Sequence, residues 1–186
     1  MSIDFKKIIR SRKPEKHQAR LSARPDAALI RAGDIAGKGR QVFVPDTNIY
    51  VMDAAGMLPP AAASIVDQGL MFHCAVCLAE LSVGVGNYAP AAADWQTVAD
   101  YYTDMFASIP ANRLLVPDAQ TWADAEMMAG VPARTQGFQK QQLKEVLNDA
   151  LVYLCAAKHG IPALTNNKGD FDLLQQIAPG GSFIFV

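Results

Sequence analysis

The stretch VFVPDTNIYV, Val42 to Val51, joins a short apolar strand directly to three small polar residues, Asp46, Thr47 and Asn48. The proline before Asp46 costs little at the end of a strand, where the chain can spare one N–H donor. We therefore predict that Asp46 lies just beyond the carboxyl end of a strand. Taken alone, its simplest role is the N-cap of the helix that follows.

Short apolar strands alternate with helices from Gln41 onward. We predict strands in five segments: VFV, MFHCA, RLLVP, PALT and SFIFV, the last of them at an edge of the sheet. We expect one short helix that ends near residue 70 and a second that covers VCLAELSVGV and ends at Gly84 and Gly86. Three further helices should span 91–106, 118–128 and 139–160, with a loop over 131–137. This alternation indicates an α/β domain with three layers and a mainly parallel central sheet. A chain of 186 residues, 51% of them hydrophobic, is long enough for one such domain.

The first 40 residues differ from the rest in charge. They carry eleven Lys or Arg against four Asp or Glu, a net charge of +7, whereas the other 146 carry six against fourteen, a net of −8. We therefore divide the chain into a basic N-terminal arm, residues 1–40, and a globular domain, residues 41–186. We expect a short helix at the start of the arm, capped by Ser2 or Asp4, and then a composition typical of a mobile tail. Such an arm binds nucleic acid, an acidic partner or the protein's own body.

The sequence favours neither a membrane protein nor a secreted one. No apolar run reaches the roughly 18 residues of a membrane span, and no apolar segment follows the basic N-terminus, so we expect a soluble, cytoplasmic protein. Three cysteines, Cys74, Cys77 and Cys155, are an odd set among apolar neighbours, which favours reduced, buried thiols. The segment HCAVC could be half of a zinc site, but no second Cys or His pair follows at the required spacing, so we do not expect zinc.

Four acidic residues occupy positions where surface acids are uncommon. Asp46 and Asp170 each follow a predicted strand. Glu80 and Asp149 lie on predicted helices among apolar neighbours, where a lone carboxylate must be paired or must bind a cation. The structural alternatives are helix caps at Asp46 and Asp170 and a salt bridge at Glu80.

Together the four acids describe an anionic cavity at one edge of the sheet, because ligands of such sheets bind beyond the carboxyl ends of the strands. Without a cation, the carboxylates would repel one another. The expected ligands are all oxygen atoms and none is a His, so the matching ion is hard, Mg²⁺ or Mn²⁺. Such an ion can activate water near neutral pH and neutralise charge on a phosphate. The motifs contain no Ser–His or Cys–His pair that would supply a protein nucleophile.

Three segments, in this order, carry a resemblance to a known family: VPDTNIYV, CLAELSVGV and LNDALVYLCAAKHGIPALTNNKGDF. They resemble the PIN-domain ribonucleases, most closely the VapC type of bacterial toxin, over residues 42–186. The resemblance implies a PIN-like nuclease domain that uses Mg²⁺ or Mn²⁺. It implies four metal-binding and catalytic acids: Asp46, Glu80, Asp149 and Asp170. It also implies three polar side chains that brace the site: Asn48, Thr165 and Asn167.

The same resemblance implies the partners of the protein. These are an RNA substrate, a cognate antitoxin protein and a second copy of the chain in a homodimer. Many relatives have an Asp where Asn167 stands, which leaves open whether one or two ions bind, and the basic arm lies outside the resemblance. Two alternatives to a toxin stay open: a solitary PIN nuclease of RNA processing, and a non-catalytic module that binds through its arm.

Overall fold

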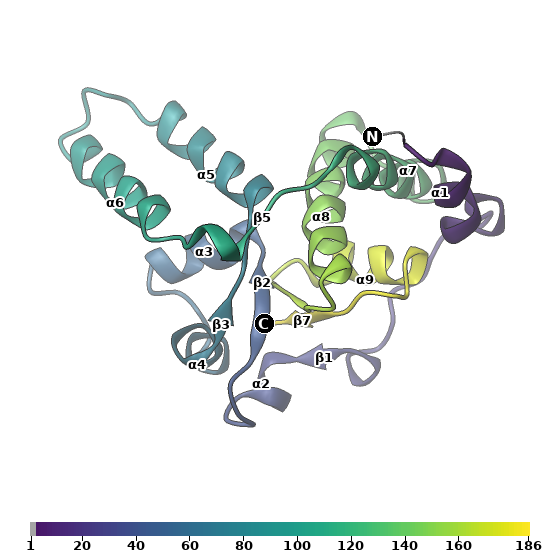
Figure 1. The fold of residues 1–186 in the computed structure, drawn as a ribbon, viewed down its shortest axis with the longest axis horizontal. Helices are drawn as coiled ribbons and strands as arrows, with labels where there is room; N and C mark the ends of the chain where they lie inside the picture. Colours follow the sequence, from purple (N-terminus) through teal and green to yellow (C-terminus); the bar gives the residue numbers. More distant parts are fainter. Residues whose placement is uncertain (1–2) are drawn as a thin grey trace.

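Strand β2 (Val42–Pro45) belongs to a five-stranded sheet in which all neighbouring strands are parallel (Figure 1). The computed structural model describes residues 3–186. In spatial order the strands are β1 (Ile30–Arg31), β7 (Phe183–Phe185), β6 (Ala163–Thr165), β2 and β3 (Leu70–Met71). A separate parallel pair consists of β4 (His73–Cys74) and β5 (Leu114–Leu115). The parallel sheet expected from the sequence is thereby confirmed.

Helices cover both faces of this sheet, which gives the three layers that the sequence predicts. Alternate strand residues divide between two apolar clusters: Val44 and Phe183 belong to the first, Phe43 and Ile184 to the second. This period of two is the pattern of strands that are buried on both faces. The first cluster contains residues of α7 (Ala119–Gln136), α8 (Lys140–Lys158) and α9 (Lys168–Ile177), and the second contains residues of α2 (Ala32–Ile35), α3 (Thr47–Ala54) and α4 (Pro60–Gln68).

Two helices, α5 (Ala75–Asn87) and α6 (Trp95–Ala107), form a pair that projects from the body at the upper left of Figure 1. Short 3₁₀ turns occur at Pro14–Lys16, Asp26–Ala28 and Ala111–Arg113.

The three cysteines are buried and free, as predicted. Within residues 3–186, no helix has the length and apolar character that crossing a membrane requires.

Two helices extend further than the sequence predicted. Helix α5 continues through Gly84 and Gly86, because glycine weakens a helix by about 1 kcal/mol without ending it. Helix α7 also continues, so the prediction of a loop over 131–137 is wrong. Its internal Pro132 is buried, and this burial favours the helix despite the backbone hydrogen bond that proline removes. The helix ends at Gly137, whose φ of 73° suits glycine.

Two strand predictions are also corrected. The segment MFHCA does not form one strand, since β3 pairs with β2 while β4 pairs with β5. The segment SFIFV forms β7, which lies inside the sheet and not at its edge, because β1 of the arm pairs with it. Strand β1 has only two residues, and both are exposed, so the sequence carries no alternation that would reveal it.

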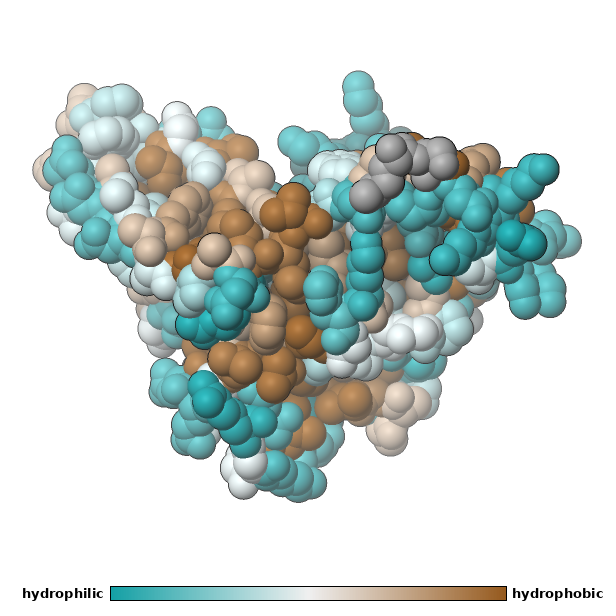
Figure 2. All heavy atoms as spheres, in the orientation of Figure 1, coloured by the Kyte–Doolittle hydropathy of each residue, from teal (hydrophilic) through white to brown (hydrophobic). Residues whose placement is uncertain are grey.

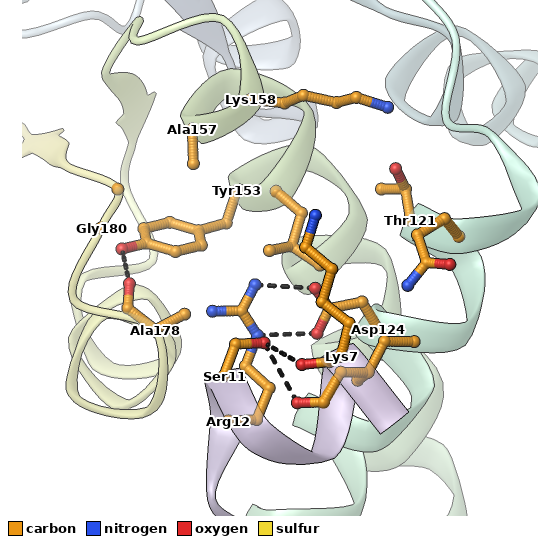
Figure 3. A pocket seen from close by; sticks show the side chains of 14 residues that line it. Lys7, Ser11, Arg12, Thr121, Asp124, Tyr153, Ala157, Lys158, Ala178 and Gly180 are labelled. Atoms are coloured by element: carbon orange, nitrogen blue, oxygen red, sulfur yellow. Dashed lines mark hydrogen bonds and ion pairs between the residues drawn. The ribbon is translucent and has the colours of Figure 1, made fainter. Parts of the chain in front are cut away.

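The first helix of the arm, α1 (Phe5–Arg12), packs on α7 of the domain. Asp4 caps it as predicted, while Ser2, the other predicted cap, lies outside the described residues. Ile8 is buried, with only 1% of its surface exposed. Arg12 donates two hydrogen bonds to Asp124, each 2.7 Å long, at the wall of a cavity of about 370 Å³ (Figure 3). Both apolar burial and charge therefore hold α1 in place.

The rest of the arm continues along the domain. Arg24 binds Asp172 of α9 through its Nε (2.5 Å) and through its backbone N–H (2.9 Å), and Asp172 is only 2% exposed. Strand β1 follows and extends the sheet beyond β7. Of the three binding partners considered for the arm, the structure shows the protein's own domain. The arm has the composition of a mobile tail but is docked, because acids of the oppositely charged domain bind its basic side chains.

Candidate functional site

Asp46 lies at the carboxyl end of β2, where it caps α3 and also faces the edge of the sheet. Its Oδ1 accepts a hydrogen bond from the Thr47 N–H (2.7 Å), and its Oδ2 accepts one from Thr165 Oγ1 (2.9 Å) at the end of β6. The side-chain amide of Asn48 lies 3.4 Å from the same Oδ2, so its contact is long. Asp46 is 2% exposed, which makes these donors its main stabilisation.

Asn167 links two further carboxylates of the predicted site. Its Nδ2 donates to Asp149 Oδ2 on α8 and to Asp170 Oδ2 on α9, both at 2.8 Å. Its backbone N–H donates to Thr165 Oγ1 (2.8 Å), which itself donates to Asp46. A continuous chain of hydrogen bonds therefore connects three of the four acids. Asn167 also caps α9, so the helix cap considered for Asp170 belongs to Asn167 instead.

Glu80 reaches the site from α5, and two side chains without a predicted role bind it. Asn148 Nδ2 donates to Glu80 Oε1 (2.6 Å), and Thr47 Oγ1 donates to Glu80 Oε2. Both had a signal in the sequence, since each is a polar residue that directly adjoins a candidate acid, Asp46 or Asp149. Among residues 3–186, none of the four acids forms an ion pair with Lys or Arg, which argues against the salt bridge considered for Glu80.

Burial and neighbouring carboxylates raise the pKa of two acids of the site, Asp46 and Asp149. Burial raises the pKa of Asp46 to about 6, and the charge of Glu80 adds to this effect, while hydrogen bonds from Thr165 and Thr47 oppose it. Burial likewise raises the pKa of Asp149, with further contributions from the charges of Asp46, Asp170 and Glu80. The four groups therefore lie within electrostatic reach of one another. Buried like charges of this kind favour a proton or a cation between them.

The four side chains suit a hard divalent ion, since each is a carboxylate and no basic side chain among residues 3–186 forms an ion pair with them. Hydroxyl and amide donors currently occupy much of the carboxylate oxygen surface. In the part of the chain that the structure describes, no three His, Cys, Asp or Glu side chains already have the arrangement of metal ligands. Taking up an ion would therefore replace some of these hydrogen bonds.

A groove opens beside Glu80, between α5 and the α7–α8 pair. Its volume is about 520 Å³, and Glu80 and Asn148 of the site line it together with Lys144 and Glu145 of α8. Val83, Val116 and Trp122 line it and are 59%, 69% and 44% exposed. Figure 2 shows hydrophobic side chains gathered in the hollow between the α5–α6 projection and the body. The acidic site therefore adjoins an exposed apolar surface, a combination that is typical of interaction sites.

Neither a family model nor a curated protein matches the sequence. Among solved structures, the chain is similar to one of FitAB bound to the IR36 DNA fragment, with 16% identity, a TM-score of 0.56 and coverage of 78% of this chain and 94% of that chain. It is similar to FitAcB from Neisseria gonorrhoeae, with 18% identity, a TM-score of 0.55 and coverage of 78% and 97%. It is also similar to VapBC-5 from Mycobacterium tuberculosis, of the VapBC family of toxin–antitoxin systems, with 21% identity, a TM-score of 0.51 and coverage of 78% and 98%. The resemblance found in the sequence is thereby confirmed at the level of the fold.

Proposed function

We propose that this protein is a metal-dependent endoribonuclease and the toxin of a type II toxin–antitoxin pair. The observation that carries the proposal is the meeting of four acids from separate elements at the carboxyl edge of one parallel sheet, without a basic partner among the described residues. Their mutual effects on the pKa of Asp46 and Asp149 support a cation site. The fold shared with VapBC-5, a member of a toxin–antitoxin family, supports the biological role.

In this proposal the ion is held by the four acids, Asp46, Glu80, Asp149 and Asp170. The bound ion, Mg²⁺ or Mn²⁺, would activate water for attack on the phosphodiester and neutralise charge on the phosphate. Thr165 keeps Asp46 at the end of β2, and Asn167 keeps Asp149 and Asp170 together through one amide nitrogen. Because Asp46 and Asp149 are almost fully buried, their charges act in a medium that water screens poorly.

Cleavage of single-stranded RNA by the purified protein tests the activity. We expect cleavage with Mg²⁺ or Mn²⁺ and none in EDTA, and we expect Asp149→Asn to abolish it. Asp104→Asn is the matched control, because Asp104 is an exposed acid on α6 outside the site. Cleavage that persists in EDTA would contradict metal dependence. A wild-type protein that binds RNA but cleaves none with either metal would favour the non-catalytic binding module.

The toxin role implies a small antitoxin, and we infer that the groove beside Glu80 receives a segment of it. The apolar wall of the groove and the polar side chains that line it offer such a segment both burial and a polar contact. Co-expression tests this role: inducing the chain should arrest growth, and the product of a neighbouring reading frame should restore it. Growth arrest that no neighbouring product relieves would favour a solitary nuclease. Sedimentation of the purified chain would test the homodimer that the resemblance implies.

A further inference from the structure

The arm carries one basic residue to the edge of the sheet where the acids meet. In the strand register, Arg31 of β1 lies opposite Phe185 of β7, and Phe185 lies opposite Thr165 of β6. Leu164 lies opposite Pro45, so one residue further along the strands Thr165 is level with Asp46. Adjacent strands lie about 4.8 Å apart, which puts the Cα atom of Arg31 roughly 10 Å from that of Thr165.

Arg31 shares this position with Lys168, the first residue of α9. The Arg31 guanidinium lies 5.8 Å from the centre of the Phe185 ring, and the Lys168 ammonium lies 5.4 Å from it. Phe185 is 7% exposed, so its ring is a fixed platform for both cations. Lys168 is also two residues before Asp170, an acid of the site. Two positive charges therefore lie on the β7 side of the acidic cluster without pairing with its acids.

The two cations differ in their partners. Lys168 Nζ binds Asp26 Oδ1 (2.7 Å) in an ion pair whose side chains are 43% and 48% exposed. Arg31 is exposed, and its guanidinium forms no ion pair within residues 3–186. The exposed ion pair between Lys168 and Asp26 is weak, so Lys168 can readily exchange Asp26 for another anion. Both cations are therefore available to a phosphate, Arg31 because it forms no ion pair within residues 3–186 and Lys168 by exchange with Asp26.

We propose that Arg31 and Lys168 bind a backbone phosphate of the RNA that lies a few nucleotides along the strand from the phosphate that is cleaved. This inference rests on the proposed function, and it assigns a positioning role to a residue of the arm. The separation of roughly 10 Å corresponds to about three nucleotides at the ~3.4 Å per-strand spacing of stacked nucleic acid. The arginine fork matches a phosphate in two hydrogen bonds, and the ring of Phe185 restricts its orientation.

The arm also contains a matched control for this assignment. Arg40 is exposed like Arg31, but it precedes β2 and so lies at the amino edge of the sheet, opposite the acids. If the arm attracted RNA only through its net charge, Arg31→Gln and Arg40→Gln would weaken binding equally. If Arg31 binds a phosphate beside the site, only Arg31→Gln has a large effect.

The test is the binding of a fluorescent single-stranded RNA to the full chain in EDTA, where no cleavage occurs. We expect Arg31→Gln and Lys168→Gln each to raise the dissociation constant about five- to tenfold and to reduce the magnitude of the salt slope by about 0.7. Arg40→Gln should stay within about twofold of wild type. Asp26→Asn should tighten binding roughly two- to threefold, because it frees Lys168.

Steady-state cleavage gives an independent measurement. Arg31→Gln should raise KM and leave kcat unchanged, since the contact is remote from the reacting atoms, and Arg31→Lys should recover most of the loss. Equal effects of Arg31→Gln and Arg40→Gln, or no effect of either on RNA that the wild type binds, would overturn this assignment and leave the nuclease untouched. A wild-type protein that neither binds nor cleaves RNA would overturn the proposed function, and this inference with it.

Discussion

At the residue scale, Asp46 combines the two roles that its sequence position allows. It caps α3 through the Thr47 N–H, and it also faces the acidic cluster from the end of β2. The two roles are compatible because each uses a different oxygen of the carboxylate. A cap whose second oxygen faces other carboxylates has an unusual titration, and this gives the first prediction.

The metal-free protein should lose stability as Asp46 ionises. Its pKa is about 6 in the folded protein, against about 3.9 for an unfolded aspartate, so the folded state binds more protons between these two pH values. Stability from this group is therefore fully present below about pH 4 and is lost as the pH rises through 6, a change of about 3 kcal/mol. In EDTA, Asp46→Asn should melt close to wild type at pH 4 and roughly 6–12 °C higher at pH 7. Equal differences in melting temperature at the two pH values would contradict this assignment.

The candidate site could be predicted from the sequence because its acids stand where apolar residues are expected. Glu80 and Asp149 interrupt apolar helices, and Asp46 and Asp170 follow strands, so each was visible without the fold. The polar residues that bind Glu80 were not assigned, because a threonine in a cap and an asparagine on a helix have many ordinary roles. Only the packing of α5 against both α3 and α8 shows that they face the same carboxylate.

At the scale of the elements, α8 was predictable because its apolar stripe runs along a long helix. Strand β2 was predictable because its apolar residues end directly at three polar ones. Strand β1 was not, since two exposed residues become a strand only when β7 offers its edge. The continuation of α5 through two glycines and of α7 through Pro132 likewise depends on tertiary packing that outweighs local propensity. The docking of the arm could not be predicted from composition either, because its partners, Asp124 and Asp172, lie in helices far away in the sequence.

The docking of the arm depends on the buried carboxylate of Asp172. Arg24→Ala should leave this carboxylate without its cation and destabilise the protein by about 2 kcal/mol, or roughly 4–8 °C in melting temperature. The expected cost is below that of a fully buried pair, because Arg24 is 31% exposed and its backbone N–H still donates to Asp172. Arg10→Ala is the control, since Arg10 is exposed on α1. Equal melting temperatures for wild type and Arg24→Ala would show that the Arg24–Asp172 pair does not help to hold the arm.

At the scale of the whole molecule, the opposite charges of arm and domain largely cancel within one chain. The net charge of +7 on the arm and of −8 on the domain leaves −1 for the protein. Ion pairs such as Arg12–Asp124 use part of this charge for docking, which leaves the acids of the site as an unneutralised group. Binding a divalent ion there should therefore stabilise the fold as a whole.

Thermal melting with and without Mn²⁺ measures this stabilisation. At a free Mn²⁺ concentration a hundredfold above its dissociation constant, linkage adds about 2.7 kcal/mol, which corresponds to roughly 5–11 °C for a chain of this size. Asp149→Asn should match or exceed wild type in EDTA, because it removes one of several repelling charges, and should lose most of the shift with Mn²⁺. A mutant that is less stable in EDTA and responds to Mn²⁺ as wild type does would remove Asp149 from the site.

The pairing of β1 with β7 has a consequence for synthesis of the protein. Strand β7 follows β1 in the sequence by about 150 residues, so this edge of the sheet cannot form until β7 has been synthesised. At 5–20 residues per second, Arg31 leaves the peptidyl-transferase centre roughly eight to thirty seconds before Phe185 is added. Until β7 emerges, strand β1 of the nascent arm therefore has no strand to pair with. Because all four acids of the candidate site precede β7 in the sequence, the side of the acidic edge that holds Arg31 is the last part of the sheet to form.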